Sequence, residues 1–447
     1  MNTDSAPHRG SPRRAVVGNG KLALLLGSIM AVTPLGVDMY LSAMPSLAES
    51  LATDATRVQL TLSAFFLGLS MGQVFYGSLA DRYGRRPLLL IGMLLFIVAS
   101  TGCAMATSVE ALIVWRFLQA AGSCAGMVIT NAVVRDRFNP IEGAHMISRM
   151  MLVMGAAPIL APLLGGFILT TLGWEAIFWA LALYGVVLLV AIALFLPETR
   201  PAHTHGPDSL WAALKVYGGV LSHRSFQGYA LSRALVQGGM FAYIAGSPFV
   251  FMTLHGVPAE YFGLLFGLNA IGIIGASQLN VHLLRRHTPD RILRGALAGI
   301  GVAGLLLCVA AMLPLSFGIP GFVALLLPLF AIMTMTGLVQ PNATVMAMAP
   351  FGDRAGSASA MVGTLMFAIA ALVSSAVAFL HDGSAMPMAA TIAVSSWLAL
   401  CVYHFRAKGS DAGSNAGSNS GSDAGNDAAS DADTAAGSGA VRKGVSN

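Results

Sequence analysis

The chain has 447 residues, of which 56% are hydrophobic and only 10% are charged, and its formal net charge is +5. A soluble domain carries roughly 25% charged residues, so the composition excludes a soluble globular protein and indicates a polytopic membrane protein. The small positive charge gives no indication of nucleic-acid binding, because the placement of arginines described below accounts for it.

Apolar runs long enough to cross a bilayer recur along the chain. A spanning helix needs ~20 predominantly apolar residues, whereas the strands of a membrane barrel are half as long and alternate in polarity. The expected fold is therefore an all-α integral membrane protein with twelve transmembrane helices. The expected spans are 22–46, 58–79, 87–107, 110–132, 147–171, 174–196, 225–251, 259–283, 292–314, 319–340, 355–380 and 386–405.

The first span contains Asp38, which is the only acidic residue within a predicted span and away from its ends. A charge at the bilayer centre costs at least ~2.5–3.5 kcal/mol on insertion scales, so such a residue indicates function and needs a partner. Arg116, in the fourth span, lies at a similar expected depth and is the candidate partner. The pair is either a static ion pair that fixes packing or a proton-coupling site whose carboxylate takes up and releases a proton.

The tight turn after the second span reads "GSLADRYGRRP". A glycine would let helices approach closely, and Asp81 could lie against the positive N-terminal end of the helix that opens near Gly356. The arginines would form a charge cluster that breaks when two halves of the bundle separate; alternatively, they only set the topology. The candidate residues of this conformational switch are Gly77, Asp81, Arg82, Gly84, Arg85 and Arg86.

The fifth span carries the stretch "GAAPILAPLLGG". Small residues and two prolines give a bendable helix face that packs tightly and resists leakage. Ordinary small-residue packing is the alternative. The residues that carry this pattern are Gly155, Pro158, Pro162, Gly165 and Gly166.

Other polar and aromatic residues within spans are candidates for substrate contact, with packing or helix–helix hydrogen bonding as the alternative. Arg233, in the seventh span, either extends to the membrane surface or lines a cavity. The candidate substrate-binding residues are Tyr40, Phe66, Phe241, Tyr243, Asn269 and Gln340.

The spans divide six to six around a polar connection, and the two parts share a layout. The same offset of 203 residues separates Arg82 from Arg285 and Leu22 from Ser225. This agreement predicts two pseudo-symmetric six-helix halves, as in transporters built from parallel repeats. The expected divisions are an N-terminal segment 1–21, a first bundle 22–196, a central loop 197–224, a second bundle 225–405 and a disordered tail 406–447.

Lysine and arginine outside the spans lie almost entirely on one side of this topology. Only Arg57 lies on the other side, so both termini, the central loop and the tail are expected to be cytoplasmic.

Several of these stretches resemble the major facilitator superfamily over residues ~20–405. "GSLADRYGRRP" resembles its signature loop, "WRFLQAAG" (115–122) its fourth-helix arginine motif, and "GAAPILAPLLGG" the fifth-helix motif of its drug:proton antiporters. "DMYLSAMP" (38–45) and "FAYIAGSPFVF" (241–251) are similar to the Bcr/CflA branch of drug-resistance transporters, although Ser42 stands where that branch has proline. The resemblance implies the superfamily's fold, Asp38 as proton carrier with Arg116 beside it, and a central cavity that opens to each side in turn.

The sequence therefore predicts proton-coupled efflux of amphipathic drugs or small molecules across the cell inner membrane by alternating access, and hence antibiotic resistance. The alternatives are a superfamily proton symporter that imports a small metabolite and a polytopic membrane enzyme. Importers of sugars or organic acids usually need more buried polar groups than these spans offer. An enzyme would show a motif such as HExxH or a nucleophile elbow, which needs a strand-to-helix turn, and these helical spans offer neither. We expect no catalytic residues, metal or cofactor, with the proton gradient as energy source. The expected partners are amphipathic substrates, protons and the lipid bilayer, without nucleic acid, and the chain is expected to act as a monomer.

Overall fold

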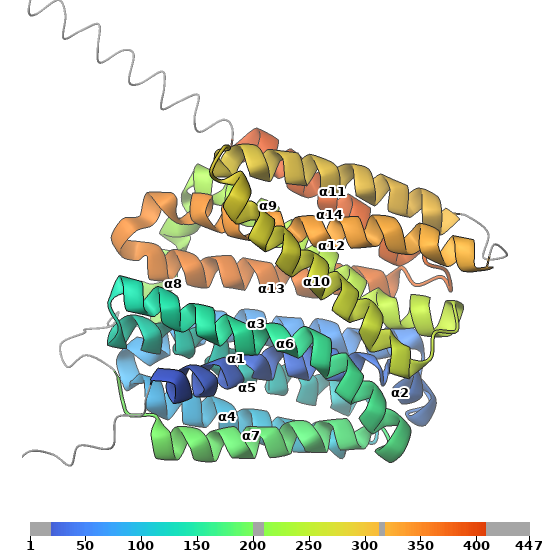
Figure 1. Ribbon diagram of the computed structural model, residues 1–447. Coiled ribbons are helices and arrows are strands. Elements are labelled where there is room, and N and C mark those ends of the chain that lie inside the picture. Colours follow the sequence, from blue (N-terminus) through green and yellow to red (C-terminus); the bar gives the residue numbers. More distant parts are fainter. Residues whose placement is uncertain (1–18, 200–209, 313–317, 408–447) are drawn as a thin grey trace, which may run out of the picture.

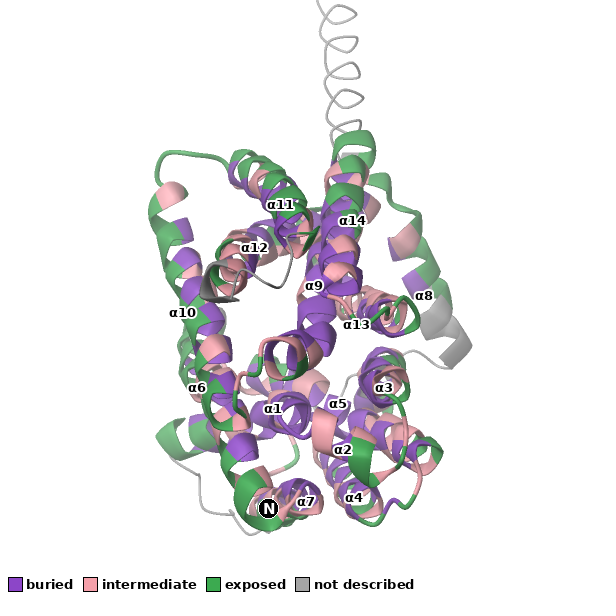
Figure 2. Ribbon diagram, turned by 90° about the vertical axis from the view of Figure 1, so that its right-hand side faces the viewer, coloured by how far each residue is buried: buried purple, intermediate pink, exposed green. Residues whose placement is uncertain are grey.

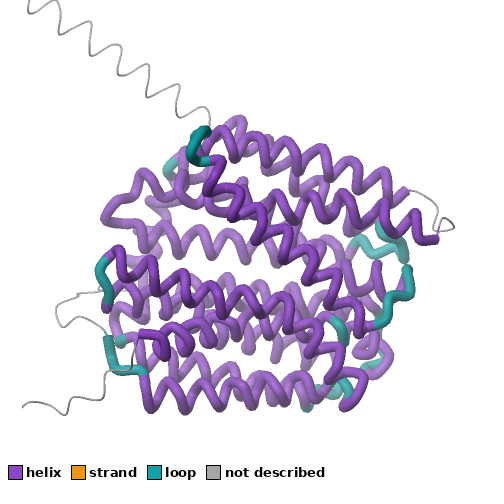
Figure 3. The backbone as a smooth tube through the Cα atoms, in the orientation of Figure 1, coloured by secondary structure: helices purple, strands orange, loops and turns teal. Residues whose placement is uncertain are grey.

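The computed structural model describes residues 19–199, 210–312 and 318–407. Within these residues the chain is helical and contains no strand, and its loops lie at the two ends of the helix bundle (Figure 3). Twelve helices of this described part are long and apolar enough to cross a membrane. The predicted fold class is therefore confirmed, whereas the predicted segments at 1–18 and 408–447 lie outside the described residues.

The spanning helices form two groups, which occupy the lower and upper parts of Figure 1. The first group consists of α1 (Asn19–Leu41), α3 (Ala55–Tyr83), α4 (Arg85–Ala104), α5 (Val109–Arg137), α6 (Pro140–Leu172) and α7 (Glu175–Phe195). The second group consists of α9 (Arg224–Ser247), α10 (Ala259–Leu283), α11 (Pro289–Met312), α12 (Gly318–Met348), α13 (Ala355–Phe379) and α14 (Met386–Val402). The short elements are α2 (Met44–Ser50), α8 (Leu210–Ser222), and the π- and 3₁₀-helical turns Pro248–Leu254, Ala349–Arg354 and Tyr403–Ala407.

Two helix pairs make most of the contact between the groups: α3 packs against α13, and α6 packs against α10. Figure 2 looks along the bundle and shows α1 and α9 as largely buried, while the outer faces of α6, α7 and α10 are exposed. Exposed side chains on these outer faces are apolar, as in Leu172, Leu183 and Leu264. Such a surface fits contact with lipid, since the backbone polar groups are satisfied within the helices.

The turns between the helices lie at two ends of the bundle, the basic side and the far side. The basic side is the end that carries the turn at Gly84, the turn at 138–139 and the turn at 284–288. The far side is the end that carries the turns at 51–54, 105–108 and 173–174. The helix α8 lies at the basic side and α2 at the far side, at opposite ends of Figure 1.

The expected first span 22–46 was wrong as a single helix. The helix α1 ends at Leu41, and the chain turns at Ser42 and Ala43 before α2 begins. Pro45 explains the break, because its ring clashes with the carbonyl of the residue four positions earlier, which is Leu41. The break brings the Ser42 hydroxyl within 3.2 Å of the Pro162 carbonyl oxygen in α6, to which it donates a hydrogen bond.

Other boundaries also differ from the sequence-based expectation: α12, for example, continues to Met348 rather than ending near 340. The connection expected at 197–224 contains the helix α8. The fifth spanning helix, α6, begins at Pro140 rather than near 147. A capping box explains the early start: the Asn139 side chain accepts from the Glu142 N–H at 2.9 Å, and the Glu142 carboxylate accepts from the Asn139 N–H at 3.4 Å.

Candidate functional site

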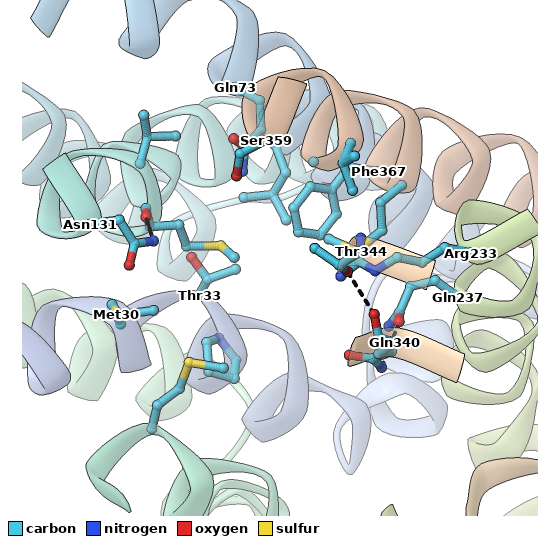
Figure 4. A pocket seen from close by; sticks show the side chains of 18 of the residues that line it. Met30, Thr33, Gln73, Asn131, Arg233, Gln237, Gln340, Thr344, Ser359 and Phe367 are labelled. Atoms are coloured by element: carbon cyan, nitrogen blue, oxygen red, sulfur yellow. Dashed lines mark hydrogen bonds between the residues drawn. The ribbon is translucent and has the colours of Figure 1, made fainter. Parts of the chain in front are cut away.

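A cavity of about 1190 Å³ lies between the two groups of helices. Each lining helix presents one face to it, so the lining residues recur every three or four positions. On α9 the lining residues are Arg233, Gln237, Met240, Phe241, Tyr243 and Ile244, and on α1 they are Met30, Thr33, Pro34, Val37 and Asp38. Figure 4 shows Arg233, Gln237 and Gln340 grouped on one wall, across from Met30, Thr33 and Asn131.

The cavity reaches the basic side. Its lining includes Arg85, Arg135, Tyr217 and Gly356, which lie at or near the helix ends there. Within the described residues, none of the far-side turns contributes to the lining, and Asp38 lies toward the closed end. The structure therefore has the cavity open to the basic side and closed to the far side.

Glycines of α6 close the far side. A β-carbon on Gly165 would overlap the carbonyl oxygen of Met39 in α1, and one on Gly166 would lie 2.8 Å from the carbonyl oxygen of Ala259 in α10. From α10, a β-carbon on Gly263 would lie 2.9 Å from the backbone nitrogen of Leu163. Only residues without a side chain allow the three backbones to approach this closely.

The five predicted residues of the α6 motif thus divide into two sets. Gly155 and Pro158 line the cavity. Pro162, Gly165 and Gly166 are buried on the far side, where they contact α1 and α10. The motif runs from the cavity wall into the closed end.

Asp38 lies in the cavity wall and is 6% exposed. In the part of the chain that the structure describes, its carboxyl group makes no hydrogen bond or ion pair. Tyr243 also lines the cavity, and its hydroxyl accepts a 2.9 Å hydrogen bond from the Asn269 amide. The carboxyl group is therefore available to a proton or a bound molecule.

Arg116 does not pair with Asp38: no ion pair joins these two described side chains, and Arg116 is absent from the cavity wall. Its guanidinium group is fully buried within the first group of helices. It donates to the Gly36 carbonyl oxygen at 2.8 Å and to the Gln119 amide oxygen at 2.7 Å. The sequence predicts that Arg116 pairs directly with Asp38, but in this structure Arg116 instead binds the Gly36 carbonyl oxygen and the Gln119 amide oxygen.

Aromatic rings surround the Arg116 guanidinium in place of a carboxylate. Its central carbon lies 4.4 Å from the ring centroid of Tyr40 and 4.3 Å from that of Phe65, within the range of cation–π attraction. Tyr40 is fully buried in this cluster, and its hydroxyl lies 2.6 Å from the Thr61 hydroxyl. Tyr40 therefore does not line the cavity, contrary to its expected role in substrate contact.

The other five candidate substrate-binding residues do line the cavity, namely Phe66, Phe241, Tyr243, Asn269 and Gln340. The ring centroids of Phe66 and Phe241 are 4.3 Å apart, and a further ring, that of Phe367, lies 6.0 Å from Phe241. These rings form a continuous apolar surface that spans the two groups of helices.

Arg233 lines the cavity, which decides between the two expected orientations of its side chain. The sequence-based selection missed several polar residues of the lining, among them Gln73, Asn131, Arg135 and Gln237. A signal existed for Gln73, Asn131 and Gln237, because each is an isolated amide in an apolar span. Within residues 19–199, 210–312 and 318–407, no group of three or more histidine, cysteine or acidic side chains is arranged to hold a metal ion.

The turn at Gly84 connects α3 to α4 and contacts both α5 and the segment that follows α7. Gly84 has a φ of 97°, a left-handed conformation that favours glycine. The Arg85 guanidinium forms a buried 2.8 Å ion pair with Asp136 of α5. The backbone N–H groups of Arg85 and Arg86 donate to the Glu198 carboxylate at 2.9 and 3.1 Å, which caps the start of α4.

These described contacts of Arg85 and Arg86 all lie within the first group of helices. Arg82 is exposed and lies over the ring of Tyr83 at 5.3 Å. The side chain of Asp81 lies outside what the structure describes, so its expected contact with the helix that begins near Gly356 stays a prediction, as does the role of Gly77 in the switch. Gly77 itself lines the cavity near the Tyr217 hydroxyl.

Comparison with known proteins matches the chain to a family of membrane transporters. Residues 26–375 match the Major Facilitator Superfamily. An uncharacterized MFS-type transporter of Bacillus subtilis, YdgK, is 36% identical over 377 residues, which cover 84% of this chain and 92% of that protein. A bicyclomycin resistance protein homolog of Haemophilus influenzae is 29% identical over 86% of this chain and 95% of its own length. A chloramphenicol resistance protein of Pseudomonas aeruginosa is 33% identical over 67% of this chain and 71% of its own length.

Solved structures share the fold at low sequence identity. A D-xylose-proton symporter has a TM-score of 0.64 at 15% identity and covers 85% of this chain and 95% of its own. A bacterial homologue of the human lysosomal transporter spinster, inward-facing and occupied, has a TM-score of 0.66 at 16% identity and covers 89% of this chain and 98% of its own. The matches to transporters confirm the prediction that the chain is not an enzyme. The chain belongs to the Major Facilitator Superfamily and is a membrane transporter related to drug-resistance proteins.

Proposed function

We propose that this transporter exports amphipathic drugs or related small molecules across the cell inner membrane in exchange for protons. Both termini and the basic side would face the cytoplasm, as the distribution of arginines predicts. A cavity open to the basic side would then load substrate from the cytoplasm. Relatives named for resistance to bicyclomycin and chloramphenicol support export of such compounds.

The proposal of proton coupling rests on one observation. Asp38 lies toward the closed end of the cavity without an ion-pair partner among the described residues. Burial in a medium of low dielectric penalises a charged carboxylate. When the cavity closes around Asp38, the acid would therefore carry either a proton or a bound substrate. Exchange of one for the other as the cavity changes sides gives antiport by alternating access.

In this mechanism Arg116 would position α1 and would not bind the proton itself. It holds the backbone of α1 at Gly36, and therefore the helix segment that carries Asp38, rather than the carboxylate itself. The α6 glycines would form the far-side seal that opens once per cycle, and the chain would work as a monomer.

The test uses inside-out membrane vesicles with an imposed pH gradient, acidic inside, and chloramphenicol as the probe. Adding the probe should dissipate part of the gradient when the wild-type protein is present, and the compound should be recovered intact. Asp38→Asn should abolish this response. Asp382→Asn, which removes an exposed acid from a far-side turn, is the matched control and should behave as wild type. Full coupled transport by Asp38→Asn would overturn the assignment.

A further inference from the structure

The cavity contains a charged group, deep in its wall, that the proposed function does not use. Arg233 lines the wall on α9, and its Nε atom is buried without a hydrogen-bond partner. In the part of the chain that the structure describes, its guanidinium group makes no ion pair or hydrogen bond. Arginine stays charged in proteins, so this cation must be compensated by water or by a bound molecule.

The neighbouring side chains do not supply a partner. Gln237, four residues along the same helix face, accepts a 2.8 Å hydrogen bond from the Gln340 amide, and its own amide donates to the Met240 sulfur at 3.2 Å. Figure 4 shows Arg233 beside this pair of glutamines and Thr344. The wall around Arg233 is therefore polar, but none of these described side chains hydrogen-bonds to its guanidinium group.

No lining carboxylate neutralises Arg233. Asp38 is the only acidic side chain among the described lining residues, and it forms no ion pair. Counting along the helices at ~1.5 Å per residue, Arg233 lies about 14 Å from the basic-side start of α9, while Asp38 lies about 28 Å from that of α1. The cation and the acid thus occupy different depths, and a molecule that enters from the basic side reaches Arg233 before Asp38.

An apolar surface begins within reach of this cation. Phe241 lies eight residues beyond Arg233 on the same face of α9, about 12 Å along the helix. The rings of Phe66 and Phe367 flank Phe241. A molecule bound along this wall would have one end at a guanidinium group and the other among aromatic rings.

Resting on the proposed function, we propose that Arg233 binds a carboxylate at one end of an amphipathic substrate whose aromatic body lies against Phe241. A planar carboxylate matches the geometry of guanidinium donors and forms stronger hydrogen bonds than a neutral group does. An ionised Asp38 repels the anionic end, so this end stays at Arg233 and the opposite, uncharged end of the molecule faces Asp38. The transporter therefore prefers aromatic carboxylates to uncharged molecules of the same shape.

Equilibrium binding to the full-length protein in lipid nanodiscs tests this preference without a proton gradient. The probes are biphenyl-4-carboxylate and the uncharged biphenyl-4-carboxamide, which differ only at the end that would meet Arg233. The wild-type protein should bind the acid tenfold or more tightly than the amide. Arg233→Gln should remove the preference, and Arg233→Lys should retain part of it.

Arg135 supplies the matched control, because it is another arginine of the cavity lining but lies at the basic-side rim. Arg135→Gln should keep the preference for the acid. An acid that fails to bind the wild-type protein, or binds no tighter than the amide, overturns the proposal. If Arg135→Gln and Arg233→Gln reduce the preference for the acid equally, the preference comes from the overall positive charge of the cavity. That result would overturn the proposal of a local site at Arg233. Neither result depends on proton coupling, which Asp38→Asn tests separately.

Discussion

The Arg116 guanidinium donates a 2.8 Å hydrogen bond to the backbone carbonyl oxygen of Gly36, two residues before Asp38 in α1. The arginine is fully buried beneath the cavity wall, whereas the acid faces the cavity. Arg116 and Asp38 are therefore linked through a helix backbone and not through an ion pair. This separation assigns them different tasks, which mutation can distinguish.

Arg116→Met should lower both stability and transport. The change leaves the Gln119 amide oxygen without its buried donor, and an unsatisfied buried polar group costs about 1–3 kcal/mol. It also removes the cation from between the rings of Tyr40 and Phe65. We expect the apparent melting temperature of the purified protein to fall by several degrees. Asp38→Asn, by contrast, should abolish coupled transport with little change in melting temperature. Wild-type thermal stability of Arg116→Met would contradict this structural role.

The relation between these residues also shows how far the sequence predicts the site. Depth along a helix follows from residue count, so Asp38 and Arg116 could be placed in similar layers. The direction in which each side chain points around its helix axis decides whether the two meet, and it depends on how α1 and α5 are rotated against each other. The aromatic surroundings of Arg116 come from α1, α3 and α7 together, and no single segment reveals them.

Residues on one helix face were easier to predict than contacts between helices. Phe241 and Tyr243 line the cavity as expected, because polar and aromatic side chains in a membrane bundle turn away from lipid. Tyr40 met the same criterion but lies in a buried cluster. Glu198 was missed as the cap of α4, since it lies more than a hundred residues from the N–H groups it accepts from.

A disulfide between α3 and α13 should stop transport reversibly. The hydroxyl groups of Ser63 and Ser374 lie 2.6 Å apart across the contact between the two groups of helices, in the far-side half of the membrane. Cysteines at both positions would be close enough to bond with little movement. The double variant Ser63→Cys/Ser374→Cys is made in a background in which the four native cysteines are replaced.

Oxidation of this double variant should reduce drug efflux to the level of cells without the transporter, and a reductant should restore it. The physical reason is that alternating access requires α3 and α13 to separate on the far side, which a covalent bond prevents. Each single variant, treated with the same oxidant, should retain its efflux. Normal transport by a fully crosslinked protein would show that this contact stays closed throughout the cycle.

Gly165→Ala should prevent full closure of the far side. The added methyl group would overlap the Met39 carbonyl oxygen, and because that atom belongs to the backbone of α1, the helices must move apart. In a cysteine-free background, Ser42→Cys reports the separation, since Ser42 is fully buried against α6. A membrane-impermeant maleimide added to the far side should label this cysteine several-fold faster with Gly165→Ala, and efflux should fall. Gly155→Ala, whose β-carbon would have no atom within 4 Å, should leave the labelling rate unchanged. Equal labelling rates in the two variants would show that Gly165 is not required for closure of the far side.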